Sequence, residues 1–223
     1  METKIEIKHL YKIFGDQPEA MLDKVKEGIG KDQLNEEFGH VLGLNNINLN
    51  IPANGVQVVM GLSGSGKSTL IRHINRLIEP TVGEVIVDGE NVLSMDDKKL
   101  RDFRRERASM VFQKFALLPH RTVMENTIYG LEIQGISESD AEKRAIYWID
   151  RVGLSGFEDN YPSQLSGGMQ QRVGLARALS TDADILLMDE AFSALDPLIR
   201  TDMQNILLDL QQELHKTIVF ITH

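Results

Sequence analysis

A glycine-rich segment at residues 61–68, Gly-Leu-Ser-Gly-Ser-Gly-Lys-Ser, has the residue types that bind phosphate groups. Its glycines let the backbone curl so that successive N–H groups point at a polyphosphate, and a helix beginning at Lys67 would add its positive N-terminal end. The Lys67 ammonium reaches the β and γ phosphates, and the Ser68 hydroxyl is a ligand for Mg²⁺. A chance glycine-rich turn would not require an apolar run before it and a helical pattern after it. We therefore predict a nucleotide site with these contacts: Gly61, Ser63, Gly64, Ser65, Gly66, Lys67, Ser68 and Thr69.

Two carboxylates, Asp189 and Glu190, follow the apolar run Ile185 to Met188. Hydrolysis of a bound nucleotide needs a water aligned with the γ-phosphorus and fixed groups that meet the developing charge. A buried strand would deliver both acids at its end, where Asp189 can hold the Mg²⁺ shell and Glu190 can polarise the attacking water. Acids at the end of a strand are also common as helix caps or solvated loop residues. The preceding Lys67 loop favours the catalytic interpretation.

The composition is that of an acidic globular protein. The chain of 223 residues has 24 Lys and Arg against 33 Asp and Glu, a formal net charge of −9, which opposes a large electrostatic footprint on nucleic acid. It has no cysteine, so disulfides and thiol catalysis are excluded. The N-terminus lacks the apolar core of a signal peptide, and no apolar run reaches the roughly eighteen residues that span a bilayer. We expect a cytoplasmic protein whose membrane work requires partner subunits.

Strands and helices alternate along most of the chain. Alternating polar and apolar residues at 4–7 and 47–51 predict half-buried strands. Helical periodicity runs from Lys67 to about Ile78 and from Pro197 to about His215. Short apolar runs predict buried strands at Val56–Met60, Val85–Val87, Met110–Phe112, Ile185–Met188 and Thr217–Ile221. This alternation predicts an α/β fold with a mostly parallel core sheet and N-terminal antiparallel edge strands.

Two helical segments interrupt this pattern. Between Asp16 and Gly43, apolar residues recur at roughly helical intervals among charged ones, which predicts one or two amphipathic helices inserted between the edge strands. The stretch from about Lys114 to Leu165 has no convincing strand and predicts an inserted helical subdomain. One of its helices begins at Ser137, with Asp140 completing a capping pattern, and continues until Gly153.

A second glycine motif, Leu165-Ser166-Gly167-Gly168, follows this subdomain. Together with the segment at 61–68 and the acids after Met188, it resembles the nucleotide-binding subunit of ABC transporters over essentially the whole chain. The resemblance implies a P-loop NTPase fold and a single ATP-binding domain over residues 1–223. It also implies that Ser166, Gly167 and Gly168 grip the γ-phosphate bound by another subunit, so that two ATP molecules lie between the subunits of a head-to-tail dimer. Met169 departs from the glutamine of the commonest version.

The resemblance also assigns an adenine contact and a communication loop. Phe14 is at the place of an aromatic that stacks on adenine, with Tyr11 as the second candidate; an ordinary core position is the alternative for Phe14. The loop Ser193 to Asp196 matches the one by which paired subunits communicate. Asp196 precedes Pro197, so it is also a good helix N-cap, and both roles are compatible.

Two further residues complete the implied catalytic machinery. Gln113 matches a glutamine that contacts Mg²⁺ or the attacking water and links the site to the helical subdomain. His223, after the last predicted strand, matches a switch histidine that contacts the γ-phosphate. The expected catalytic residues are Glu190, Gln113 and His223, and the expected metal ligands are Ser68, Gln113 and Asp189.

Several segments narrow the resemblance to importers of glycine betaine and proline. These are residues 75–81, residues 188–200 and the insertion between Asp16 and Gly43. The resemblance implies an ATP-hydrolysing subunit at the cytoplasmic face of the membrane, with permease subunits and, indirectly, an extracytoplasmic substrate-binding protein as partners. Residues 115–120 look like the docking surface for a permease helix; packing inside the helical subdomain is the alternative. No nucleic acid partner is expected.

Three other functions remain open on sequence grounds. A soluble ABC-type ATPase of DNA repair or translation would use the same motifs, but it usually carries a coiled-coil insertion or a second ATPase half. A GTPase or small-molecule kinase would share the phosphate loop, but the chain lacks an Asn-Lys-x-Asp motif and has the segment 165–172. ABC subunits continue past the switch histidine, so we also expect a truncated chain that could act as a binding fragment without turnover.

Overall fold

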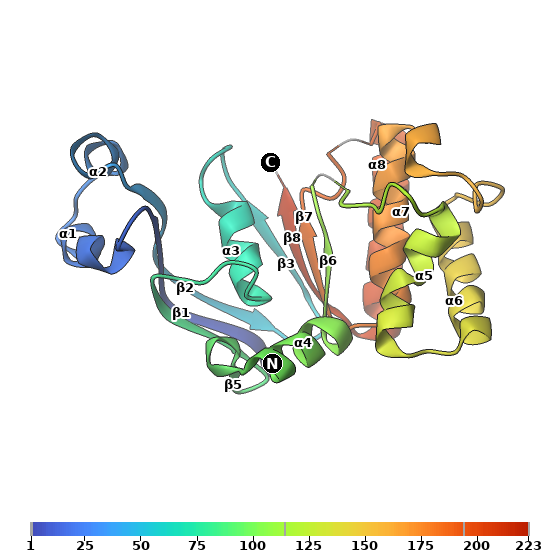
Figure 1. The fold of residues 1–223 in the computed structure, drawn as a ribbon, viewed down its shortest axis with the longest axis horizontal. Helices are drawn as coiled ribbons and strands as arrows, with labels where there is room; N and C mark the ends of the chain where they lie inside the picture. Colours follow the sequence, from blue (N-terminus) through green and yellow to red (C-terminus); the bar gives the residue numbers. More distant parts are fainter. Residues whose placement is uncertain (1, 114, 194, 223) are drawn as a thin grey trace. The chain divides into compact units, whose positions relative to one another are not determined.

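The computed structural model of the chain describes residues 2–113, 115–193 and 195–222. The chain divides into two compact units (Figure 1). The first unit comprises residues 1–53 and 60–100, and the second comprises residues 54–59 and 101–223. The predicted phosphate loop belongs to the first unit, and the two predicted catalytic carboxylates belong to the second.

The first unit is built on a four-stranded antiparallel sheet with the order β2-β1-β4-β5. Its strands are β1 (Thr3–Phe14), β2 (Val41–Pro52), β4 (Val82–Val87) and β5 (Glu90–Asn91). Alternate residues of β1 face the core, and Ile5 and Ile7 are buried opposite Val87 and Val85. The predicted strand at Val85–Val87 exists, but its assignment to a parallel sheet is wrong. A short apolar run does not indicate which strand it pairs with. Here it pairs antiparallel with the long strand β1.

The predicted insertion is helical, as expected, but it forms three short helical elements where one or two helices were predicted. They are η1 (Pro18–Met21), α1 (Leu22–Lys26) and α2 (Lys31–Phe38). Val25 and Leu34 are fully buried and pack in one apolar cluster with Tyr11, Ile13 and Leu42 of the sheet. The insertion ends before Gly43, because β2 already begins at Val41.

Helix α3 (Lys67–Ile74) follows the phosphate loop and is shorter than predicted. The apolar pattern extends to Ile78, but Arg76 has a left-handed backbone with φ of 53°. The amide of Leu77 then bonds to the Arg72 carbonyl at 2.8 Å, which closes the helix end. Periodicity alone therefore overestimated this helix by about one turn. A 3-10 turn η2 (Val92–Ser94) and helix α4 (Asp97–Glu106) follow β5.

The second unit contains the predicted parallel sheet, with the order β3-β8-β7-β6. Its strands are β3 (Val56–Met60), β6 (Ala108–Val111), β7 (Ile185–Asp189) and β8 (Thr217–Thr222). The pairs β6–β7 and β7–β8 are parallel, and every residue of β7 is buried. The prediction of a buried strand is wrong for β3, because Val56 and Val58 are 41% and 43% exposed. Among the described strands β3 is at the edge, with only β8 beside it.

Helices of the second unit pack beside this sheet, as predicted for the helical subdomain. They are α5 (Val123–Gln134), α6 (Glu138–Arg151), η3 (Pro162–Gln164), α7 (Gly167–Ser180) and α8 (Pro197–Leu214). Helices α5, α6 and α7 contact one another and lie side by side in Figure 1. The described residues between 115 and 165 form no strand, and Ser137 caps α6 as predicted by accepting a bond from the Asp140 amide. Within the described part of the chain, no helix has the length and apolarity required to cross a membrane.

Candidate functional site

The glycine-rich loop of the first unit has the curled backbone that phosphate binding requires. Gly64 and Gly66 have φ values of 74° and 94°, in the left-handed region that favours glycine. Gly66 is also tightly packed, since a Cβ there would overlap the Gly43 carbonyl oxygen of β2. Two independent constraints, conformation and space, therefore require glycine at position 66.

The Lys67 side chain is folded back into this loop. Its Nζ donates hydrogen bonds to the carbonyls of Gly61 at 2.8 Å and Leu62 at 3.0 Å, and the residue is only 7% exposed. A buried ammonium has to be satisfied by such partners. The loop therefore holds a positive charge at the place where the sequence predicts the β and γ phosphates. Ser68 and Thr69 lie in the first turn of α3, and the Thr69 carbonyl accepts a 2.6 Å bond from the ring of His73.

Phe14 is the accessible aromatic residue of the two adenine candidates. It ends β1 with 39% of its surface exposed, and the Lys12 ammonium lies 4.9 Å from its ring centroid. Its ring packs against Gly43. Tyr11 is buried in the cluster under the insertion helices. Of the alternatives, stacking on a flat ligand thus suits Phe14, while Tyr11 has a core position.

The two carboxylates lie at the end of β7 in the second unit, where the sequence placed them. Asp189 is fully buried and Glu190 is 9% exposed. The Gln113 amide, beyond the end of β6, donates a 2.5 Å hydrogen bond from Nε2 to Oε2 of Glu190. Glu190 has a left-handed backbone with φ of 49°, a conformation that costs about 1–3 kcal/mol outside glycine. The structure thus brings together Gln113 and Glu190, which are far apart in sequence, at a strained position.

The predicted Mg²⁺ ligands have the chemistry that this ion prefers. Asp189, Gln113 and Ser68 offer carboxylate, amide and hydroxyl oxygens, and Mg²⁺ is bound by oxygen. The bond from Gln113 to Glu190 uses the amide nitrogen, which leaves the amide oxygen as an acceptor. These residues therefore fit the ion by type.

The second glycine motif forms the start of α7. Ser166 is the N-cap and accepts a 3.3 Å bond from the Met169 amide. Ser166 and Gly167 are exposed, whereas Leu165 is buried and anchors the motif in the core of the second unit. Met169 packs against that core, so its departure from glutamine leaves the exposed serine and glycine N–H groups unchanged. An exposed helix start of this kind suits an anion.

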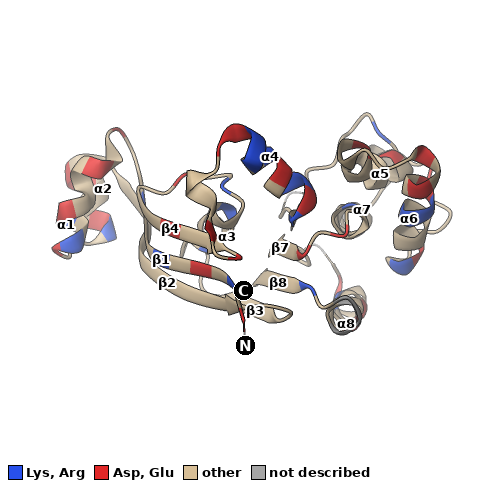
Figure 2. Cartoon of the chain, turned by 90° about the horizontal axis from the view of Figure 1, so that it is seen from below, with Lys and Arg blue, Asp and Glu red and all other residues tan. Residues whose placement is uncertain are grey.

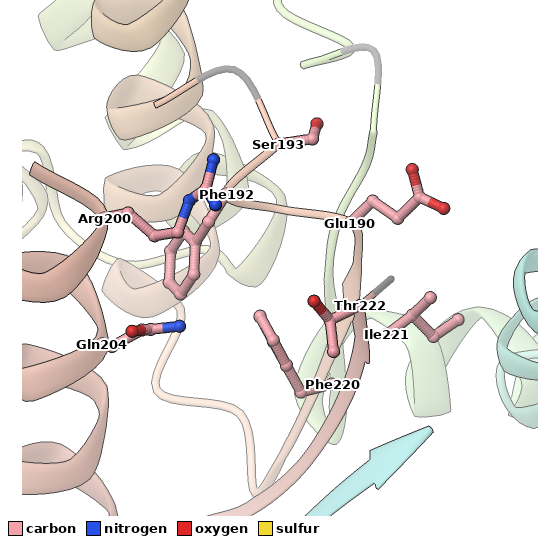
Figure 3. Close-up of a pocket in the computed structure, with 8 residues that line it drawn as sticks. All are labelled: Glu190, Phe192, Ser193, Arg200, Gln204, Phe220, Ile221 and Thr222. Carbon is pink, nitrogen blue, oxygen red and sulfur yellow. The ribbon is translucent and has the colours of Figure 1, made fainter. Parts of the chain in front are cut away.

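The loop after Glu190 leads into α8 beside a cavity of about 210 Å³. Asp196 caps the helix, as predicted, and its Oδ1 accepts bonds from the amides of Leu198 and Ile199 at 3.1 Å each. Figure 3 shows Glu190 at the end of β7 and Arg200 entering from α8. The predicted switch histidine, His223, lies outside the described residues. The role of Asp196 in subunit communication stays a prediction.

Arg177 of α7 is a half-buried cation that belongs to none of the motifs. Its guanidinium donates hydrogen bonds to the carbonyls of Phe115 at 3.1 Å and Ala116 at 2.8 Å, and burial lowers its pKa from the usual value. Both acceptor residues are left-handed, each with φ of 49°. An arginine among apolar neighbours in α7 was the available signal. It holds the described residues Phe115 and Ala116.

This anchored segment is the predicted permease-docking surface, residues 115–120. Leu117 packs against the core of the second unit, which supports the alternative of subdomain packing for that residue. The buried Asn126 side chain bonds to both the amide and the carbonyl of Leu118. Pro119 and His120 are exposed. Docking of a partner on this surface remains a prediction.

The two units therefore contain the elements of a P-loop ATPase of the ABC type: a phosphate loop, paired carboxylates after a buried parallel strand, and a glycine motif at a helix start. A family model described as "ABC transporter" matches residues 44–193. Because this match covers more than half of the chain, the chain belongs to the ABC transporter family.

Within this family, the chain is similar to two ATP-binding proteins of betaine transport and to one solved cassette structure. The chain is 54% identical over 220 residues to the glycine betaine transport ATP-binding protein OpuAA of Bacillus subtilis, covering 99% of the chain and 53% of that protein. It is 52% identical over 223 residues to the glycine betaine/proline betaine transport system ATP-binding protein ProV of Escherichia coli, covering 100% of the chain and 56% of that protein. The chain thus spans about half the length of these relatives. The dimeric structure of the bacterial ABC transporter cassette MJ0796 matches with a TM-score of 0.84 and 34% identity, covering 98% of this chain and 88% of the cassette chain.

Proposed function

We propose that the chain is the ATP-binding and ATP-hydrolysing subunit of an ABC importer that powers uptake of glycine betaine and proline-type osmoprotectants. The observation that carries hydrolysis is the hydrogen bond from Gln113 to Glu190 at the end of a buried strand. The solute is supported by the names of the relatives alone, because no described residue recognises a quaternary amine by its own chemistry. As part of the same proposal, residues 1–223 form one ATP-binding domain.

The residues perform complementary steps. The N–H groups of residues 61–69 and the Lys67 ammonium bind the phosphates, and the exposed Phe14 ring stacks on the base. Glu190 accepts a proton from the attacking water, and its bond to Gln113 fixes the direction of the carboxylate. His223 contacts the γ-phosphate. Mg²⁺, held by Ser68, Gln113 and Asp189, would neutralise charge on the phosphates.

A complete site requires a second subunit in this proposal. The exposed start of α7, with Ser166, Gly167 and Gly168, binds the γ-phosphate held by the partner's loop in a head-to-tail dimer. The dimeric cassette MJ0796 supports this assembly by its similarity. Permease subunits bring the dimer to the cytoplasmic face of the membrane, and an extracytoplasmic binding protein delivers the solute to them.

Turnover by the assembled transporter tests the proposal. ATP hydrolysis and uptake of glycine betaine are measured with the permease subunits, for wild type and for Glu190→Gln. The substitution removes the base but keeps the size of the side chain, so we expect ATP binding to persist and hydrolysis to fall by about 10²-fold or more. Lys67→Ala serves as the contrasting variant, because it should lose binding itself. Undiminished hydrolysis by Glu190→Gln would show that the catalytic assignment is wrong.

A further inference from the structure

A lysine of the insertion lies against the phosphate loop, although no motif places it there. Lys31 is the first residue of α2, and its Nζ donates a 3.2 Å hydrogen bond to the Gly64 carbonyl. The two residues are 33 positions apart, and both belong to the first unit. The loop therefore meets a second ammonium besides that of Lys67.

The position of Lys31 is set by a packed element. Leu34, one turn further along α2, is fully buried in the cluster that contains Tyr11 and Ile13 of β1. At the base of the insertion, the His40 ring bonds through Nδ1 to the Phe38 carbonyl at 2.6 Å and through Nε2 to the Asp16 carbonyl at 2.7 Å. These contacts attach α2 to the sheet, so the lysine stem starts from a fixed backbone.

The loop is attached to the same end of the sheet. Gly66 packs directly on the Gly43 carbonyl, and Gly43 lies against the ring of Phe14. The insertion leaves the sheet after Phe14 and returns to it just before Gly43. Both ends of the insertion are thus beside the proposed nucleotide site, within one unit.

The charge of the insertion makes Lys31 distinctive. Residues 16–43 contain seven Asp and Glu but only three lysines. Figure 2 shows both signs of charge on α1 and α2. The Lys24 ammonium lies 4.8 Å from the ring centroid of Phe38, and Lys26 is exposed on α1 without a hydrogen bond or ion pair to the described residues. Of the three, Lys31 alone contacts the phosphate loop.

We propose that Lys31 is a further phosphate-binding residue of the nucleotide site, supplied by the insertion. The inference rests on the proposed function, since it takes ATP as the ligand. A lysine ammonium is strongly attracted by a polyphosphate, whereas a single carbonyl is a weak partner for it. When a nucleotide enters, Nζ exchanges the Gly64 carbonyl for a phosphate oxygen. The insertion thereby becomes part of the ATP site.

Binding of nucleotides to the full chain tests this role. The affinities for ATP, ADP and adenosine are measured by calorimetry for wild type, Lys31→Ala, Lys31→Gln and the matched control Lys26→Ala. Both Lys31 variants should bind ATP about five-fold more weakly at low ionic strength, the upper range for an exposed charge pair. The loss should shrink to less than about two-fold in 0.5 M salt, because salt screens exposed charges. Binding of adenosine should not change, and Lys26→Ala should match wild type.

Three results would overturn the inference. The first is ATP affinity of both Lys31 variants equal to that of Lys26→Ala. The second is tighter binding, which would mean that Lys31 holds the loop closed against the nucleotide. The third is an equal loss for adenosine, which would indicate a damaged fold. Failure of wild type itself to bind ATP would refute the proposed function instead, and Lys67→Ala shows what loss of phosphate binding looks like in the same assay.

Discussion

Replacing Arg177 by methionine should destabilise the second unit and slow catalysis without weakening ATP binding. Arg177 donates two hydrogen bonds to the carbonyls of Phe115 and Ala116. Hydrogen bonds to charged groups contribute about 1.5–3 kcal/mol each. Part of this is offset, because burial disfavours the charged guanidinium and lowers its pKa. Water can also replace the lost partner of the exposed Ala116.

Relaxation of the backbone reduces the loss further. Phe115 and Ala116 are both left-handed, and each such residue stores about 1–3 kcal/mol. Releasing them from Arg177 lets one or both return to common conformations. We therefore expect the free energy of unfolding to fall by about 2 kcal/mol, the surplus of the hydrogen bonds over burial and strain. The same relaxation should displace Gln113 from Glu190, so kcat should fall roughly ten-fold while the KM for ATP stays within about two-fold.

The chain offers a built-in probe for the unfolding measurement. Its single tryptophan, Trp148 of α6, is buried in the second unit, so fluorescence during urea unfolding reports on that unit. Arg144→Met is the matched control, since it removes a cation from an exposed position of the same helix as the probe. If Arg177→Met unfolds at the same urea concentration as Arg144→Met, the guanidinium does not hold the segment. A rise in KM with unchanged kcat would refute the link to Gln113.

Two predictions concern the first unit. Both ring nitrogens of His40 face carbonyl oxygens, and the bonds to Asp16 and Phe38 raise its pKa above the usual value. A raised folded-state pKa stabilises below the unfolded pKa, near 6.5, and the contribution disappears as pH rises through the folded value. As pH rises above about 6.5, hydrogen exchange of α2 in wild type should therefore accelerate by more than the ordinary base catalysis seen with His40→Gln. Parallel pH profiles of exchange in the two proteins would contradict the mechanism. Gly66→Ala should lower the free energy of unfolding by more than about 2 kcal/mol, because its Cβ would overlap the Gly43 carbonyl. Gly64→Ala has open space for its Cβ and should lower it by only about 1 kcal/mol through backbone strain. Equal losses measured by calorimetry would show that packing on the Gly43 carbonyl is unimportant.

Local chemistry was the part of the site that the sequence could predict. The loop at 61–68 is defined by residues adjacent in the chain, and glycine is needed there for conformation and close packing. The acids after β7 are likewise placed by the strand that precedes them. The end of α3 was predicted too late because Leu77 and Ile78 continue the apolar pattern, while the left-handed Arg76 has already ended the helix. The spacing of apolar residues does not reveal that the backbone of Arg76 is left-handed.

Contacts between distant segments were the part that the sequence could not predict from physical reasoning. Lys31 lies on a helix rich in charged residues, so its charge looks like an ordinary solvent-facing position, whereas the apolar neighbours of Arg177 mark it as unusual but do not identify its partners. Only packing shows that Lys31 contacts the carbonyl of a loop residue and that Arg177 binds two left-handed residues. The resemblance implied that Gln113 contacts Mg²⁺ or the attacking water, but its bond to Glu190, 77 residues away, was not predicted.

Helix α7 connects the two strained segments of the second unit. Its Gln171 side chain donates a 3.5 Å bond to the carbonyl of the left-handed Glu190. Its Arg177, on the same helix, holds the left-handed pair after Gln113. Unusual backbone conformations persist only where the surroundings impose them, so neither segment can relax independently of α7. The helix capped by the exposed Ser166 therefore bonds to Glu190 directly and to the pair Phe115 and Ala116, and we expect a displacement at its start to reach Glu190 through Gln171.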